Sequence, residues 1–209
     1  TLDRSSAASD VYKRQMSTGA ISAMLLRFAS QFVGHLRGGL GYANVLTSTL
    51  FAGISGSALA DAAGPGAMMV RMMEKGGYDR AYAGALTIAT SVVGPIIPPS
   101  ITMIIYALQD RNVSVGSLFM AGILPGVLIS LVMAGVNWWI SRKRGYRSAE
   151  ARPHLRQMVR NTVAALPALA LVVLIVGGIR GGVFTPTEAS VIAVGYAIFV
   201  SAVIYRGFT

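Results

Sequence analysis

The chain has 209 residues, of which 54% are hydrophobic and only 12% are charged, and its mean hydropathy is +0.60. This composition excludes an ordinary soluble domain and indicates a protein that crosses a membrane several times. The net charge of +10 does not indicate nucleic-acid binding, because the basic residues lie in clusters between apolar runs, as loop charges of membrane proteins do. The absence of cysteine excludes disulfides, thiolate catalysis and thiol metal sites.

Residues 1–15 are polar, show no hydrophobic period and lack the apolar core and cleavage site of a signal peptide. Within them, Ser5–Gln15 resembles translated adapter sequence from the ends of metagenomic gene predictions. We therefore expect a non-native or disordered leader, and a membrane domain over residues 16–209. Apolar residues recur at helical spacing from Ile21 to Leu36, which predicts an amphipathic helix near the membrane surface.

Two apolar arms follow, Leu40–Ala52 and Ala58–Val70, with Gly53–Ser57 between them. Each arm has thirteen residues, which is about 20 Å of helix and too short to cross ~30 Å of hydrocarbon. The sequence therefore predicts a re-entrant hairpin over residues 40–70 that enters and leaves the membrane on one side.

The next apolar segment, residues 81–108, is interrupted by Gly94–Pro99. Proline has no backbone N–H and glycine disfavours a helix, so this stretch does not continue the helix before it. Backbone groups freed in hydrocarbon need partners, so such a break is buried in protein or lines a cavity. We predict one discontinuous span with its two halves on either side of the break.

Three further spans are predicted, over residues 118–140, 162–179 and 189–204. The loop over residues 141–161 is rich in arginine, which places it in the cytoplasm by the positive-inside rule. Together these segments predict an all-α integral membrane protein. It is a multi-span helical bundle with one re-entrant hairpin and one discontinuous helix.

If the hairpin tip meets the helix break near the membrane midplane, four helix ends converge on one small cavity. Carbonyl groups at the helix C-termini, with the hydroxyl groups of Ser55, Ser57 and Ser100, are oxygen ligands that suit Na⁺. Exposed N–H groups at the helix N-termini suit a carboxylate. Each break could instead be a kink packed against neighbouring helices, but two adjacent breaks flanked by hydroxyl groups favour an ion and substrate site.

Two acidic residues have competing roles. Asp61 is the one carboxylate inside a predicted membrane arm, where it fits a Na⁺ or proton ligand, but it also complements the dipole of the helix that begins near Ser57. The sequence leaves both roles open. Glu188 ends the pattern Thr185-Pro-Thr-Glu188, and we expect it to close a capping box rather than act in chemistry.

Five motifs occur in a fixed order: Phe51-Ala-Gly-Ile-Ser-Gly-Ser-Ala-Leu-Ala-Asp61, Gly76-Gly-Tyr78, Gly94-Pro-Ile-Ile-Pro-Pro-Ser100, Leu118-Phe-Met-Ala-Gly-Ile-Leu-Pro-Gly126 and Phe184-Thr-Pro-Thr-Glu-Ala189. In this order they resemble the large membrane subunit of TRAP transporters, the DctM-like permeases. The similarity runs from about Met16 to the last residue, and the order of the motifs is more specific than any one of them.

The resemblance implies a Na⁺-coupled secondary transporter in the bacterial inner membrane that imports organic anions by an elevator-like movement, and that is not an enzyme. It implies two partners, a periplasmic solute-binding protein and a small four-helix membrane subunit, and no cofactor besides Na⁺ as the coupling ion. The sodium ligands of the family map onto Ser55, Gly56, Ser57, Gly94, Ile97 and Pro98. The substrate carboxylate is expected at Ser57, Pro99 and Ser100, with Asp61 as a further candidate.

Two departures from the family pattern are visible. Arg71 stands where the family has a proline in the returning arm of the hairpin, and Pro65 replaces an aliphatic residue, so we expect the bend of this arm to be displaced. Family members are also much longer. The chain would lack the opening helices and most of the second inverted repeat, so the resemblance implies half of an inverted-repeat transporter, and we expect the chain to be a fragment.

Other classes remain open. The runner-up is a related anion symporter or antiporter that works without a binding protein. A membrane-embedded enzyme using Ser57 or Asp61 is a further alternative, although the sequence offers no base beside the serine. A passive channel would show flux without saturation. The sequence does not indicate which organic anion is carried.

Overall fold

The computed structural model describes residues 20–110, 112–146 and 154–200, and the expected leader at residues 1–15 lies outside them. Every regular element in these ranges is helical. The elements are α2 (Ala20–Val33), α3 (Gly39–Ser55), α4 (Ala58–Asp61), the π-helical segment η1 (Ala62–Gly66), α5 (Ala67–Lys75), α6 (Arg80–Ser91), α7 (Ile101–Gln109), α8 (Val115–Arg144), α9 (Leu155–Arg180) and α10 (Pro186–Phe199).

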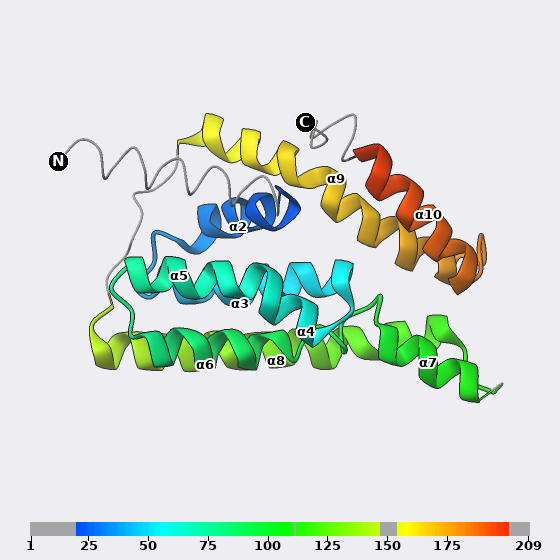
Figure 1. Cartoon of the computed structure of the whole chain (residues 1–209), viewed down its shortest axis with the longest axis horizontal. Helices are drawn as coiled ribbons and strands as arrows, with labels where there is room; N and C mark the ends of the chain where they lie inside the picture. The colour runs from blue at the N-terminus through cyan, green and yellow to red at the C-terminus, as the bar shows by residue number, and fades with distance from the viewer. Residues whose placement is uncertain (1–19, 111, 147–153, 201–209) are drawn as a thin grey trace.

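The helices stack in layers, as Figure 1 shows. The helices α6 and α8 run side by side along one edge, and α3 and α5 pack on them. The helix α2 lies between α3 and α9, and α10 packs on α9 at the opposite edge. Because α3 contacts α2, α6, α8 and α9, the hairpin that it opens lies in the middle of the bundle.

Two of the described helices, α8 and α9, are long and apolar enough to cross a membrane. Only 17% of the most apolar stretch of α8 and 11% of that of α9 is buried, whereas such helices in a soluble protein would form the core. Their exposed faces carry large apolar side chains such as Leu124, Leu131 and Val173. This exposure fits contact with lipid.

Both helices are longer than the spans predicted from the sequence. The predicted span 118–140 lies inside α8, which runs on through Arg144, and the predicted span 162–179 lies inside α9, which begins at Leu155. The extra turn of α8 is basic, and positive charge at a helix C-terminus complements the helix dipole. The loop expected over residues 141–161 is therefore partly helical, and residues 147–153 lie outside the described ranges.

The predicted hairpin is built from α3 on one side and from α4, η1 and α5 on the other, and the two sides pack together. The predicted arms ended at Ala52 and Val70, whereas α3 runs to Ser55 and α5 to Lys75. The returning arm continues through Pro65 because the backbone widens there into a π-helical turn, which accommodates a ring that would clash with an α-helical turn. The irregularity lies at Pro65, as expected for the displaced bend.

Polar side chains join the hairpin to its neighbours. The amide nitrogen of Asn44 donates to Thr87 Oγ1 at 2.7 Å, and one helical turn further on the hydroxyls of Ser48 and Thr90 are 3.2 Å apart. These pairs connect α3 to α6 along buried faces. Buried hydrogen bonds between helices and small side chains at the contact are typical of helix packing in membranes.

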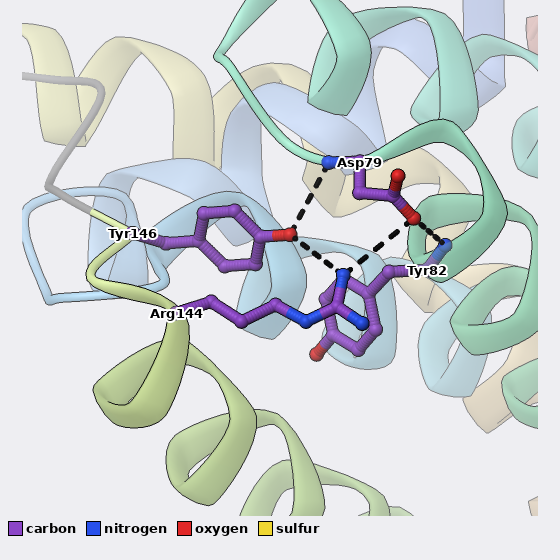
Figure 2. Close-up of polar contacts among 4 residues, drawn as sticks. All are labelled: Asp79, Tyr82, Arg144 and Tyr146. Carbon is purple, nitrogen blue, oxygen red and sulfur yellow. Dashed lines mark hydrogen bonds and ion pairs between the residues drawn. The ribbon is translucent and has the colours of Figure 1, made fainter.

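A cluster of rings and charges fastens the base of the hairpin to the end of α8 (Figure 2). The rings of Tyr78, Tyr82 and Tyr146 stack, with the centroids of Tyr78 and Tyr146 4.2 Å apart. Arg144 Nη1 lies 3.4 Å from the hydroxyl of Tyr146 and 3.5 Å from Asp79 Oδ1, and its guanidinium lies over the ring of Tyr82. This arrangement holds the α5–α6 loop against α8.

The predicted capping box at α10 is confirmed. The amide of Thr185 donates to Glu188 Oε2 at 2.7 Å, and the amide of Glu188 donates back to Thr185 Oγ1 at 3.4 Å. Glu188 therefore has the local structural role that the sequence indicates. The described residues end at Val200, so the predicted span 189–204 is described only in part.

Candidate functional site

The hairpin tip is a tight turn at Gly56 and Ser57. The helix α3 ends at Ser55, and Gly56 has a φ of 60°, in the left-handed region that glycine adopts without steric cost. Ser57 is extended and begins the returning arm, where its hydroxyl accepts the amide of Ala60 at 3.5 Å. The tip thus places the C-terminal end of one helix beside the N-terminal end of the next.

The helix break lies between Ser91, where α6 ends, and Ile101, where α7 begins. Its first residues form turns in which the amides of Ile96 and Ile97 both donate to the carbonyl of Val93 at 3.0 Å. The break was predicted at Gly94–Pro99, and the structure confirms it. Proline at three positions of this stretch prevents a helical ladder from forming.

The tip and the break touch each other, and Figure 1 shows the turn before α4 beside the loop that leads into α7. A Cβ atom placed on Gly94 would lie 2.7 Å from Asp61 Oδ2 and 3.0 Å from the carbonyl carbon of Ser57. A Cβ atom placed on Gly56 would lie 2.7 Å from the carbonyl oxygen of Pro99. Only glycine permits both approaches, so the two glycines bring the backbones together.

Asp61 lies at the centre of this contact and is 1% exposed. The hydroxyl of Ser55 donates to its Oδ1. Its Oδ2, which faces Gly94, has no hydrogen-bond partner among the described residues. A buried carboxylate oxygen without a partner is costly, so this position favours a bound cation or a proton.

Carbonyl oxygens of the break supply further possible ligands. Within the described ranges, hydrogen bonds reach the carbonyls of Val93 and Pro95, whereas those of Gly94, Ile97 and Pro98 accept none. The described residues contain no group of three or more His, Cys, Asp or Glu side chains that could hold a metal ion. A cation here would therefore be held by backbone carbonyls, hydroxyls and one carboxylate, which are ligands that suit a hard ion.

The hydroxyl group of Ser100 forms hydrogen bonds within its own loop and the first turn of α7. Its hydroxyl donates to the carbonyl of Pro95 at 2.6 Å, lies 2.9 Å from Thr102 Oγ1 and accepts the amide of Met103 at 3.3 Å. The side chain is fully buried. These bonds give Ser100 a structural role as the N-cap of α7. Its expected contact with the substrate stays a prediction.

A cavity of about 160 Å³ opens next to the tip and the break. Ser55, Pro99 and Ser100 line one side of it, and apolar side chains of α7 to α10, such as Phe119 and Ile175, line the rest. Of the residues expected to bind the substrate, Pro99 and Ser100 therefore border this space, whereas Ser57 and Asp61 do not line it, and most of its wall is apolar.

The structure brings together six of the expected site residues: Ser55, Gly56, Ser57, Asp61, Gly94 and Pro99. Ile97 and Pro98, the remaining expected sodium ligands, have other neighbours. The side chain of Ile97 packs against Gly126 of α8, and the carbonyl of Pro98 faces Gly53 of α3.

Sequence reasoning missed two glycines of α8 that shape the site. Gly122 lies against the carbonyl of Ile96 and the side chain of Met103, and Gly126 lies against Ile97, so the break rests on a face of α8 without side chains. The spacing of the two glycines, Gly-x-x-x-Gly, is the signal that could have identified this face as a packing surface.

Comparisons with known proteins identify the family of this chain. A family model described as "Tripartite ATP-independent periplasmic transporter, DctM component" matches residues 13–209. The chain is 41% identical over 195 residues to the sialic acid TRAP transporter permease SiaT of Haemophilus influenzae, covering 93% of this chain and 31% of the relative. It is 40% identical over 191 residues to the C4-dicarboxylate TRAP transporter large permease DctM of Pseudomonas aeruginosa, covering 91% and 44%.

A third relative is the 2,3-diketo-L-gulonate TRAP transporter large permease YiaN of Escherichia coli, which is 39% identical over 194 residues, covering 93% of this chain and 45% of the relative. The chain thus spans less than half the length of these three relatives. The family consists of transport permeases rather than enzymes. The match over nearly the whole chain and the identities of about 40% show that the chain belongs to the DctM family of integral membrane permeases.

Proposed function

We propose that the chain is part of the large membrane subunit of a tripartite transporter that imports organic anions on a Na⁺ gradient. The names of the three relatives each specify an organic acid or its anion, which supports this substrate class. The transporter works with a periplasmic solute-binding protein and a small membrane subunit, and it lies in the bacterial inner membrane with the basic end of α8 in the cytoplasm.

The observation that carries this proposal is the contact of the hairpin tip with the helix break. Asp61 Oδ2 at this contact, and the carbonyls of Gly94 and Ile97 within the break, have no hydrogen-bond partners in the described part of the chain. We assign Na⁺ to the oxygen atoms of Ser55, Gly56, Ser57, Gly94, Ile97 and Pro98, with Asp61 balancing the charge. The ion then provides a partner for oxygen atoms that would be costly to leave without one at membrane depth.

The substrate carboxylate is assigned to the cavity bordered by Ser55, Pro99 and Ser100. The helix α7 begins beside Ser100, and the positive end of a helix dipole attracts a carboxylate. A Na⁺ ion at the tip would add positive charge next to this position. Binding of the ion and of the anion would therefore favour each other, which is the basis of coupled transport.

The proposal is tested by Ser57→Ala in the complete permease, reconstituted with its small subunit and its binding protein. Removing one hydroxyl ligand of a charged group costs about 1.5–3 kcal/mol, so we expect half-maximal uptake to need about 10- to 150-fold more Na⁺. Ser114→Ala is the matched control, because Ser114 is exposed and its side chain caps no backbone amide. Unchanged Na⁺ activation in Ser57→Ala would contradict the assignment.

A further inference from the structure

The end of α8 carries two tryptophans followed one helical turn later by two cations. Arg142 lies over the ring of Trp138, with 5.5 Å between its guanidinium carbon and the ring centroid, and Lys143 Nζ lies 5.6 Å from the ring centroid of Trp139. The tryptophans are 54% and 60% exposed, and both cations are exposed. Two cation–π pairs therefore stand side by side on the outer surface of the helix.

The third basic residue of this turn behaves differently. Arg144 is exposed as well, but its side chain contacts Asp79, Tyr82 and Tyr146, as Figure 2 shows. Among the described residues, neither Arg142 nor Lys143 forms an ion pair. Two of three consecutive cations thus remain available for an external anion.

The position of the pairs identifies the surroundings of that anion. The outer face of α8 is exposed and apolar over much of its length, with Leu128, Leu131 and Val132 among its side chains. Tryptophan rings at the end of such a helix lie at the level of the lipid headgroups, and basic side chains just beyond them reach the phosphate layer. The anion that meets Arg142 and Lys143 is therefore carried by the membrane itself.

We propose that Arg142 and Lys143 form a binding site for the phosphate of an anionic phospholipid, with Trp138 and Trp139 packed on the upper acyl chain. Stacking on the rings restrains both long side chains, so less side-chain entropy is lost when the phosphate binds. An anionic lipid is preferred over a zwitterionic one because its headgroup carries a net negative charge that the two cations attract, whereas a zwitterionic headgroup is neutral overall. The site lies outside the hairpin tip and does not depend on the proposed transport function.

Tryptophan fluorescence reports on this site alone, because the two tryptophans of the chain are Trp138 and Trp139. The 209-residue chain is reconstituted in phosphatidylcholine vesicles that contain one brominated lipid. This lipid is either phosphatidylglycerol or phosphatidylcholine, and in both cases the bromine is in the upper acyl chain. Bromine quenches tryptophan fluorescence on contact, so quenching against lipid fraction gives the relative association of each lipid. Each basic residue at an anionic membrane surface contributes about fivefold, so we expect a preference for phosphatidylglycerol of at least about fivefold.

The double variant R142Q/K143Q is expected to bring the preference for phosphatidylglycerol to about one, with unchanged helix content by circular dichroism. R71Q/K75Q is the matched control, because it removes the same charge from two exposed residues at the same end of the molecule. An equal loss in this control would show diffuse attraction and overturn the proposal. Displacement of the lipid by inorganic phosphate in the buffer would assign the cations to a soluble anion and would also overturn it.

Discussion

Gly94→Ala is the sharpest test of the contact between the hairpin tip and the helix break. The added methyl group would lie 2.7 Å from Asp61 Oδ2, 3.0 Å from the carbonyl carbon of Ser57 and 3.1 Å from the amide nitrogen of Ala58. Two of these atoms are backbone and the third belongs to a buried carboxylate, so none can turn aside. The tip and the break must separate by roughly half an ångström to restore ordinary carbon contacts.

Overpacking of this kind costs about 1–3 kcal/mol, which is a factor of about 5 to 150 in an equilibrium constant. This free energy destabilises the state in which the tip and the break bind one ion together, because their oxygen atoms are then too far apart to contact the same ion. We therefore expect Gly94→Ala to weaken the affinity for Na⁺ by a factor in this range. The stability without Na⁺ is expected to fall as well.

The assay is thermal unfolding of the purified complete permease with and without Na⁺, together with Na⁺ activation of uptake. A ligand that binds only the native state raises its unfolding temperature, so the increase caused by Na⁺ measures the site. Gly84→Ala is the matched control, because no side chain and no backbone beyond its own helix turn lies within 4 Å of its Cβ position. Alanine in a helix is favoured over glycine by up to about 1 kcal/mol, so this variant is expected to be at least as stable as the parent.

One result would refute the reasoning in full. If Gly94→Ala keeps the parent's response to Na⁺ in both measurements, the contact of tip and break does not form an ion site. A lower unfolding temperature with an unchanged increase on adding Na⁺ would show a packing contact alone, and would contradict the ion assignment equally.

Two further predictions concern the region where α8 meets the base of the hairpin. Asn137 accepts a hydrogen bond from the Tyr82 hydroxyl at 2.9 Å and donates one to the carbonyl of Gly38 at 3.2 Å. We expect Asn137→Ala to lower the free energy of unfolding by about 1–3 kcal/mol, measured by thermal unfolding. Asn112 is exposed, and Asn112→Ala should leave the free energy of unfolding almost unchanged. Burial raises the pKa of Tyr78 to about 12, so its stabilising contribution is complete below about pH 10, where an unfolded tyrosine ionises, and is lost as the pH rises towards 12. Tyr78→Phe should remove one group from the high-pH end of the tyrosinate absorbance titration, and an unaltered titration would show that Tyr78 is not the residue concerned.

Much of the architecture could be predicted because its causes are local. Glycine and proline interrupt a helix wherever they cluster, so the tip at Gly56 and the break after Ser91 follow from composition over a few residues. The capping box at Thr185 depends on residues three apart in the sequence. The predicted ends of the helices were less accurate, because a π-helical turn at Pro65 and a basic last turn of α8 extend them.

The site itself could be predicted only as a list of residues. No local pattern shows that Gly94 faces Asp61, since the two lie on different segments and meet only when α3, α6 and α8 pack in one register. The commitment of Ser100 to the carbonyl of Pro95 is likewise a result of the folded loop. Ser100 was predicted as a ligand because the sequence shows its hydroxyl group but not the group to which that hydroxyl is hydrogen-bonded.

The sequence by itself determined that this protein lies in a membrane, where its helices are broken, and which family it resembles. The tertiary structure decided which oxygen atoms lie together, and which of three consecutive cations contacts the loop between α5 and α6. The physical reason is that helix breaks depend on the backbone chemistry of neighbouring residues, whereas shared contacts depend on how separate helices are placed against each other. Arg142 and Arg144 are the same residue type two positions apart, yet one faces outward and the other contacts Asp79.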